Sequence, residues 1–275
     1  MSAHYKGIGG RMENNKENEV LSGMETARLA ATRGHKVIIC EKDGHIGGQV
    51  VLAAIPPKRQ NFLKLVDYYT FQLSQLHVEI RLNVEVDEEV IDEIKPDEIV
   101  VATGSLPRIP QIPGLFDCSM DVVLAKDILS GNEIPGDNVL IIGGQRYGLL
   151  VADYLAEAGK DVVVINSSKH LAEDLAANDR WPLITRLRTA GVKIYKRNSI
   201  IKEIKDDVII ALIEGNEVQI KDRDQIVIAD AMRSERSVVN IIRKTEIPYH
   251  IIGDAKEPRG CLEAIAEAHE LASAL

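Results

Sequence analysis

The chain has 275 residues, 45% hydrophobic and 27% charged, which is typical of one or two globular domains with a sizeable core. Its net charge of −9 argues against a general nucleic-acid binder and against a polybasic membrane-binding surface. No apolar run approaches the roughly 20 residues of a membrane-spanning helix, and the N-terminus lacks the apolar core of a signal peptide, so we expect a cytoplasmic protein.

After a polar segment at 1–19, predicted helices and strands alternate along the first part of the chain. The alanine-rich residues 24–33 predict a helix that ends at Gly34, and the apolar run 36–40 predicts a strand buried on both faces. Apolar residues at helical spacing predict a long helix over 58–76. The other elements predicted here are a strand at 78–82, a helix at 88–94 and a strand within 97–104.

A connector with three prolines, Pro107, Pro110 and Pro113, leads to a second strand–turn–helix–strand unit that starts at Asn138. Strands alternating with helices predict an α/β fold with parallel sheets. The elements predicted after this unit are a helix at 181–190, strands at 193–195, 208–213, 218–221 and 225–228, and a C-terminal helix at 262–275.

Residues 24–40 and 149–165 share one layout, in which a small-residue helix, a glycine and a buried strand follow one another. Glu41 and Asn166 each stand seven residues after the glycine that ends the helix. This layout is the second half of a dinucleotide-binding βαβ unit, and it occurs twice. We therefore expect two Rossmann-like dinucleotide-binding domains.

The turn of such a unit reads GxGxxG, with glycines for the tight turn, for close approach to the pyrophosphate and for helix packing. In the second copy Gly143 and Gly144 open the turn and Gly148 packs the helix. Gln145 replaces the middle glycine, so we expect its side chain to point at the position of a pyrophosphate. Arg146 then offers charge to a phosphate or lies in solvent. Asn166 replaces the acid that usually accepts a ribose 2′-OH.

The first copy keeps only the third glycine of this pattern, Gly23. Asn18 and Val20 stand at the other two glycine positions, and the polar run 11–17 replaces the strand that should precede them. Glu41 remains where an acid would bind a ribose. We therefore expect an adenosine half-site with a weakened phosphate turn, in a sheet that has lost the strand of its first fingerprint.

Four segments agree with one known family in order and spacing: EKDGHIGGQ (41–49), DEIVVATGSLPRIPQIPG (97–114), NVLIIGG (138–144) and IIGDAKEPRGCLEAIAEA (251–268). They resemble the C-terminal FAD- and NAD(P)-binding region of the 2,4-dienoyl-CoA reductase, trimethylamine dehydrogenase and NADH:flavin oxidoreductase family. The resemblance covers nearly everything from Gly23 onward. It implies an FAD or adenine-nucleotide domain built from about 1–110 and 230–275, into which an NAD(P)-type domain, 111–229, is inserted.

The resemblance also implies cofactor contacts, residue by residue. It places the ribose of FAD, or of ADP or AMP alone, at Glu41 and Lys42, and the adenine at Val86. It implies contacts with the phosphates and the flavin at Gly48, Gln49, Ala102, Thr103, Gly104, Gly253 and Asp254. The predicted cofactor-binding set is completed by the turn glycines Gly23, Gly143, Gly144 and Gly148, and it contains no assigned catalytic residue and no metal ligand.

Two functions remain open. The first is a redox module in which hydride passes from NAD(P)H in the second domain to FAD in the first, and electrons pass on to a partner. That partner would be a subunit such as an FMN-binding barrel, because the family's N-terminal barrel has no counterpart in this sequence. The second is a non-catalytic nucleotide-binding or assembly subunit of an oxidoreductase complex, favoured by Gln145 and Asn166. In either case we expect an oligomer.

A third function, that of a disulfide reductase, needs a redox-active cysteine pair beside the flavin. The three cysteines, Cys40, Cys118 and Cys261, stand far apart in the sequence and form no CxxC motif. This function is therefore rejected.

Overall fold

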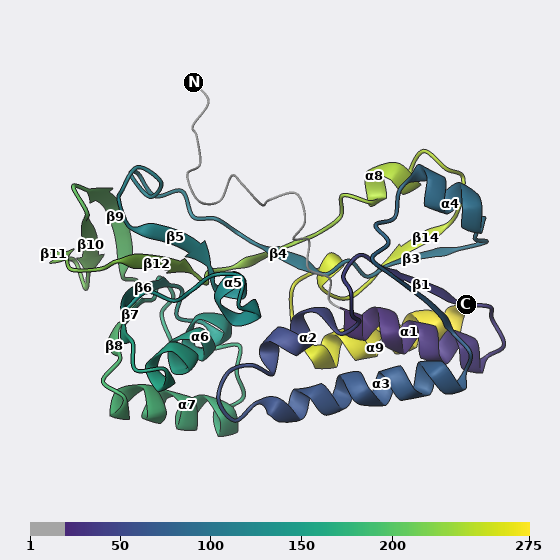
Figure 1. Cartoon of the computed structure of the whole chain (residues 1–275), viewed down its shortest axis with the longest axis horizontal. Helices are drawn as coiled ribbons and strands as arrows, with labels where there is room; N and C mark the ends of the chain where they lie inside the picture. Colours follow the sequence, from purple (N-terminus) through teal and green to yellow (C-terminus); the bar gives the residue numbers. More distant parts are fainter. Residues whose placement is uncertain (1–19) are drawn as a thin grey trace. The chain divides into compact units, whose positions relative to one another are not determined.

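The computed structural model describes residues 20–275, which form two compact units (Figure 1). Unit 1 consists of residues 55–58 and 107–231, and unit 2 consists of residues 20–54, 59–106 and 232–275. Each unit alternates helices and strands, so the predicted α/β class is confirmed. The assignment of one nucleotide type to each unit stays a prediction.

Unit 1 is built on a five-stranded parallel sheet with the strand order β5–β12–β6–β7–β8. Its inner strands are almost entirely buried, which explains why they read as continuous apolar runs in the sequence. The strands are β5 (Asp121–Leu124), β6 (Asn138–Ile142), β7 (Asp161–Ile165), β8 (Lys193–Tyr195) and β12 (Gln225–Ile228). The helices of this unit are α5 (Ala125–Ser130), α6 (Arg146–Glu157) and α7 (Ala177–Thr189).

A three-stranded antiparallel sheet, in the order β11–β10–β9, follows β8. Its strands are β9 (Ile200–Lys205), β10 (Val208–Ile213) and β11 (Asn216–Ile220). Ile209 and Ala211 of β10 share one buried cluster with Leu140 and Ile226 of the parallel sheet, so the core of unit 1 includes both sheets. The strand β9 was not predicted, because its sequence IIKEIK is largely exposed and mixes charged with apolar residues.

Unit 2 contains separate strand pairs: β1 with β2, β3 with β14, and β4 with β13. Within residues 20–275 no strand joins β1–β2 to β3–β14, and the segment before Gly23 that should supply one lies outside the described residues. The strands are β1 (Ile38–Glu41), β2 (Glu79–Leu82), β3 (Ile99–Val101), β4 (Ser105–Pro107), β13 (Met232–Ser234) and β14 (Tyr249–Ile251).

The prediction that the strand at 36–40 is buried on both faces is wrong. Ile38, Ile39 and Cys40 are only partly buried. The reason is that, among the strands of residues 20–275, β1 pairs with β2 alone and has no second strand beside it.

The main helical contact of unit 2 is between the two ends of the described chain, where α1 packs along α9 (Figure 1). Ala27 and Ala30 of α1 and Ala264, Ala268 and Ala272 of α9 are all buried, and such small side chains let two helices approach closely. The helical segments of unit 2 are α1 (Val20–Thr32), α2 (Gly48–Ala53), η1 (Gln60–Phe62), α3 (Leu63–Gln75), α4 (Glu88–Ile94), α8 (Val239–Ile242), η2 (Gly253–Ala255) and α9 (Cys261–Ala274).

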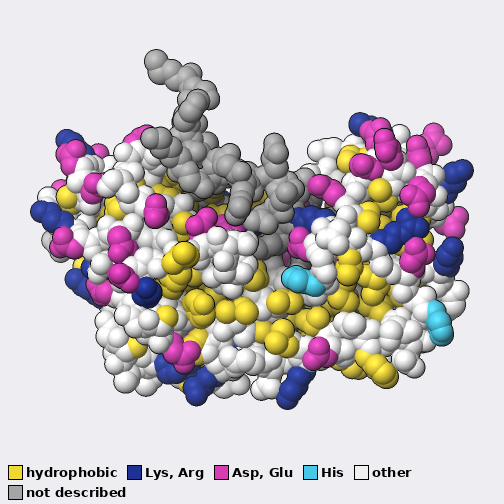
Figure 2. Space-filling view, in the orientation of Figure 1, with side chains coloured by type: hydrophobic (Ala, Val, Ile, Leu, Met, Phe, Trp, Pro, Cys, Tyr) yellow, Lys and Arg dark blue, Asp and Glu magenta, His cyan; other side chains and the backbone are white. Residues whose placement is uncertain are grey.

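The surface carries both signs of charge. On the face shown in Figure 2, the acidic and basic side chains of the described residues are interspersed. Among the described helices, none combines the length and the apolar character needed to cross a membrane.

Candidate functional site

The candidate site of unit 2 lies where β3 and β14 end. The two strands are parallel, with Val101 opposite Ile251, so the turns that follow them emerge at the same edge. These turns are 102–104 and 253–254, both predicted to contact a cofactor. Ligands of α/β folds bind outside the carboxyl ends of parallel strands. The backbone pairing therefore brings the two predicted turns together.

A chain of hydrogen bonds joins these turns to α2. Nε2 of Gln49 donates to Oγ of Ser105 at 2.9 Å and to its carbonyl oxygen at 3.2 Å. Oγ of Ser105 in turn donates to Oδ2 of Asp254 at 3.1 Å. Ser105 is fully buried and Asp254 is 5% exposed. Ser105 was not among the predicted site residues, and the only sequence signal for it is its place directly after the ATG turn.

The turn at Gly253 and Asp254 is fixed from α9. The Gly253 N–H donates to Oε2 of Glu267 at 3.0 Å, and Nζ of Lys256 donates to Oε1 of the same residue at 3.0 Å. The Arg259 guanidinium also pairs with Oε1 of Glu267, while the Arg259 N–H donates to Oδ1 of Asp254 at 2.8 Å.

Burial alone would raise the pKa of Glu267. The hydrogen bonds from Arg259, Lys256 and the Gly253 N–H outweigh it and hold the pKa of the Glu267 carboxyl below its ordinary value. Glu267 is therefore an ionised anchor for the turn that carries Asp254.

The predicted ribose ligand Glu41 ends β1 and is 3% exposed. Its Oε1 accepts the N–H of Asp43 at 3.0 Å, which orients the carboxylate at the end of the strand. Lys42 beside it is partly buried. Val86, predicted to contact adenine, packs against the cluster that contains Val101.

The other predicted residues of unit 2 lie in the turn after β3, in η2 and in the helices α1 and α2. Gly104 and Gly253 have φ of 73° and 59°, a backbone region that favours glycine. Oγ1 of Thr103 donates to the carbonyl oxygen of Glu235 at 2.6 Å. Gly23 faces Ala102, since a Cβ at position 23 would lie 3.3 Å from the Ala102 methyl. Gly48 is buried at the start of α2.

The polar side chains of unit 2 fit an adenine nucleotide that also carries a ribityl chain. Glu41 and Asp254 are buried carboxylates at the carboxyl ends of strands, and such groups accept hydrogen bonds from sugar hydroxyls. Gly104 and Gly253 allow the backbone to approach a ligand closely.

In unit 1 the three turn glycines are tightly packed. A Cβ on Gly148 would lie 2.0 Å from the Gly143 carbonyl oxygen, and one on Gly143 would lie 2.3 Å from the carbonyl oxygen of Ala229. A Cβ on Gly144 would lie 2.5 Å from the Cβ of Asn166. Each of these positions therefore requires glycine for packing alone.

The two polar replacements of unit 1, Gln145 in the turn and Asn166 directly after β7, hydrogen-bond to one segment of the chain, residues 168–174, which we call the capping segment. Nε2 of Gln145 donates to the His170 carbonyl oxygen at 3.2 Å, and its Oε1 accepts the Glu173 N–H at 3.0 Å. Nδ2 of Asn166 donates to the carbonyl oxygens of Ser168, at 2.7 Å, and of His170, at 3.3 Å. Both side chains thus hydrogen-bond to the capping segment, and the expectation that the Gln145 side chain points at the position of a pyrophosphate stays a prediction.

The N-terminus of α6 is also covered by this segment. The Arg146 N–H donates to Oδ1 of Asp174 at 2.8 Å, and Nε of Arg146 lies 3.7 Å from Oδ2. A carboxylate thus occupies the helix end at which a dinucleotide turn binds its pyrophosphate. In this arrangement the N–H of Arg146, the first residue of the helix, already has an anionic partner.

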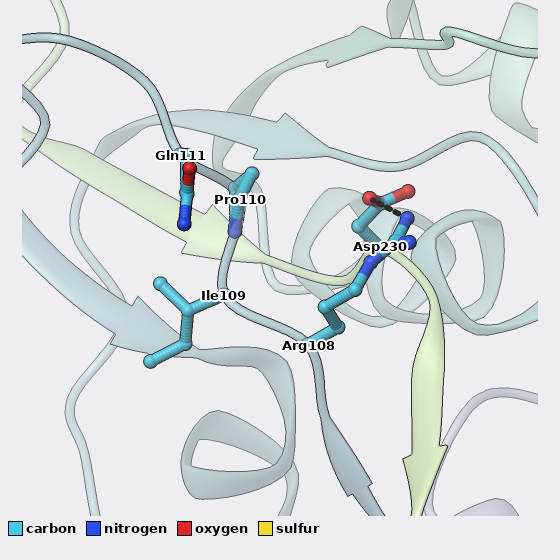
Figure 3. Close-up of a pocket in the computed structure, with 5 residues that line it drawn as sticks. All are labelled: Arg108, Ile109, Pro110, Gln111 and Asp230. Atoms are coloured by element: carbon cyan, nitrogen blue, oxygen red, sulfur yellow. Dashed lines mark hydrogen bonds and ion pairs between the residues drawn. The ribbon is translucent and has the colours of Figure 1, made fainter.

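A cavity of about 410 Å³ opens beside this turn (Figure 3). It is lined by the connector residues Arg108, Ile109, Pro110 and Gln111, and by Asp230. Two of these side chains, Arg108 and Asp230, form an ion pair of 3.3 Å. Asp230 lies just beyond the end of β12, and its backbone nitrogen would be 2.9 Å from a Cβ on Gly143. The cavity therefore borders the carboxyl edge of the unit 1 sheet.

No disulfide and no metal centre accompany these sites within residues 20–275. The three cysteines form no disulfide, and the described histidine, cysteine, aspartate and glutamate side chains form no group of three or more that could hold a metal ion.

Comparisons of the sequence and of the structure with known proteins agree on one family. The profile of the pyridine nucleotide-disulphide oxidoreductase family matches residues 21–244. The cinnamate reductase of Clostridium sporogenes is 33% identical over 92% of this chain, and the NADH oxidase of Thermoanaerobacter brockii is 29% identical over 91%. The matches cover 37% and 39% of those relatives, so the chain spans about two fifths of their length.

Solved structures agree with this result. A complex of 2-naphthoyl-CoA reductase with 2-naphthoyl-CoA matches 95% of this chain with a TM-score of 0.86 and 32% identity, over 40% of its own chain. Histamine dehydrogenase from Rhizobium sp. 4-9 matches 97% of this chain, over 45% of its own, with a TM-score of 0.81. At 22% identity, this second likeness concerns the fold alone.

Proposed function

The chain belongs to the pyridine nucleotide-disulphide oxidoreductase family, and we propose that it is the electron-transfer module of a larger NAD(P)H-linked oxidoreductase, with FAD held in unit 2. Relatives named as a cinnamate reductase and an NADH oxidase support an oxidoreductase role. The chain spans about two fifths of these relatives, and we propose that the substrate is bound outside the two units, by another part or partner of the oxidoreductase. Assembly as an oligomer and a cytoplasmic location stay predictions.

The observation that carries this proposal is the hydrogen-bonded chain Gln49–Ser105–Asp254 at the shared edge of β3 and β14. Asp254 and Glu41 would accept hydrogen bonds from the ribityl and ribose hydroxyls. Ser105 and Gln49 hold Asp254 in place, so that little reorganisation accompanies binding. The flavin itself would supply the redox chemistry.

The second candidate is a nucleotide-binding or assembly subunit that does not oxidise NAD(P)H. The specific observation in its favour is the Asp174 carboxylate on the Arg146 N–H. On this candidate, unit 2 holds ADP or AMP and unit 1 holds no dinucleotide.

The test is to purify the chain, extract any bound nucleotide for mass spectrometry, reconstitute with FAD, and assay NADH and NADPH oxidation with ferricyanide. The main proposal expects bound FAD and turnover in the presence of the dye. Bound ADP or AMP, or no nucleotide at all, without turnover would refute the main proposal and support the second candidate. Robust turnover with ferricyanide would refute the second candidate.

A site variant makes the first outcome specific. Asp254→Asn removes the charge of the buried carboxylate, and Asp92→Asn makes the same change at an exposed position of α4 in the same unit. We expect weakened FAD binding in Asp254→Asn only. Equal affinities in the two variants would place the flavin elsewhere.

A further inference from the structure

We propose that the capping segment, residues 168–174, is an internal competitor of NAD(P)H in unit 1, with the Asp174 carboxylate standing where the pyrophosphate would bind. The segment must leave the N-terminus of α6 before a dinucleotide can bind. The proposal deepens the proposed function, because it concerns the nicotinamide site of that same module.

The capping segment contacts three positions that bind a dinucleotide in an ordinary βαβ unit. The middle glycine position (Gln145), the first helical residue (Arg146) and the ribose position (Asn166) each hydrogen-bond to it. The amide nitrogen of Asn166 carries two N–H donors, and both are used, on the carbonyl oxygens of Ser168 and His170. A ribose could therefore not receive a hydrogen bond from Asn166 while the segment is in place.

The capping segment is packed into unit 1. Leu171 is 7% exposed and Ala172 is fully buried, and the Ala172 N–H donates to the Gly144 carbonyl oxygen at 2.9 Å. Ala172 has φ of 44°, which an alanine adopts only at a cost. The segment is thus packed into unit 1, and its release would relieve the backbone strain at Ala172.

The Asp174 carboxylate also interacts electrostatically with the N-terminus of α6. The N-terminus of a helix carries a partial positive charge that favours an anion, and Asp174 supplies one. The Asp174 side chain is 43% exposed and that of Arg146 36%, so solvent screens this contact. A pyrophosphate would compete for the same N–H and would be repelled by the nearby carboxylate. Asp174 therefore lowers dinucleotide affinity without abolishing it.

The test compares NADH and NADPH dissociation constants, measured by isothermal titration calorimetry on the full chain, for the wild type, Asp174→Asn and Asp179→Asn. The control, Asp179, is an exposed aspartate in the first turn of α7. We expect Asp174→Asn to bind at least about fivefold more tightly than the wild type, because it removes an anion from the helix end. Asp179→Asn should match the wild type. Equal affinity in all three proteins would overturn the proposal.

A second measurement needs no variant. Hydrogen exchange read by mass spectrometry is recorded for the wild type with and without saturating NADH. We expect peptides covering 168–174 to exchange faster when NADH binds, because the segment is released. Binding that leaves the exchange of 168–174 unchanged, or slows it, would contradict displacement.

These outcomes are separable from those of the proposed function. Flavin binding in unit 2 is read from the nucleotide extracted from the protein, whereas the competitor is read from NAD(P)H affinity and from exchange at 168–174. A flavoprotein with equal NAD(P)H affinity in the wild type and Asp174→Asn refutes the competitor alone. A protein without flavin whose Asp174→Asn variant binds NAD(P)H more tightly refutes the flavin assignment alone.

Discussion

Oγ of Ser105 donates a hydrogen bond to Oδ2 of Asp254 at 3.1 Å, joining two turns that are 149 residues apart in the chain. The bond is possible because β3 and β14 are parallel neighbours whose carboxyl ends lie side by side. It links the two motifs that the sequence places in a flavin site, and it makes Asp254 part of a fixed arrangement.

Ser105→Ala tests this link. The substitution removes a donor to Asp254 and an acceptor for Gln49, both in a buried setting. We expect the free energy of unfolding to fall by about 1–2 kcal/mol, because buried polar groups lose their partner. Urea titration measures this change, and FAD affinity should fall with it. Ser74→Ala, at an exposed serine of α3, should change neither, and equal effects of the two substitutions would remove Ser105 from the site.

Glu41→Gln tests the ribose contact. Gln keeps an oxygen that can accept the Asp43 N–H, so the fold should persist, but it loses the charge that strengthens a hydrogen bond to a ribose hydroxyl. ADP affinity should fall about tenfold, as measured by calorimetry. The control Glu89→Gln changes an exposed acid of α4 and should bind as the wild type does. Unchanged ADP affinity in Glu41→Gln would exclude the ribose from this strand end.

Glu267→Gln tests the anchor of the Gly253–Asp254 turn. Since the pKa of Glu267 is lowered in the folded protein, its charge stabilises the fold above the unfolded-state pKa of about 4.3, and this stabilisation is lost as the pH falls through the lower folded value. We expect Glu267→Gln to be less stable than the wild type by about 2 kcal/mol at pH 7, because charge-assisted hydrogen bonds are lost. The difference should shrink below about pH 4. If the stability difference between Glu267→Gln and the wild type did not change with pH, the charge of Glu267 would not be its source.

The two helix-packing glycines should respond differently to alanine. Gly148→Ala places a Cβ 2.0 Å from a backbone oxygen, so we expect a loss of about 3 kcal/mol in unfolding free energy. Gly23→Ala meets only the Ala102 methyl at 3.3 Å, and the gain in helix propensity offsets this contact to within about 1 kcal/mol. Thermal unfolding of both variants measures the contrast. Similar losses of unfolding free energy in the two variants would mean that Gly23 and Gly148 are packed equally tightly.

Much of the fold follows from local sequence patterns. The apolar runs at 138–142 and 225–228 are buried strands, and the run at 88–94 is the helix α4. The strand at 225–228 and the helix at 88–94 have the bounds that were predicted. Periodicity suffices there because burial on defined faces determines the element. It fails for β9, whose sequence IIKEIK mixes charged and apolar residues without strict alternation, and for β1, whose burial depends on which strand lies beside it.

The site was predictable only in part. The ATG and GDA motifs indicate where turns follow strands, and Asp254 could be named from the second of them, while Gln49 was named from the segment 41–49. Ser105 could not, because only the tertiary fold brings position 105 to position 254. The capping segment was missed for the same reason: Asp174 is a surface acid in the sequence, and its place on α6 is set by the path of the chain after β7.

The most direct test of the account is hydrogen exchange of the full chain, read by mass spectrometry, with and without saturating ADP or FAD. We predict slower exchange in peptides that cover 38–43, 102–105 and 253–259, with no change at 143–148, because the nucleotide binds at the strand ends of unit 2. Protection at 143–148, with none at the three segments of unit 2, would contradict the account.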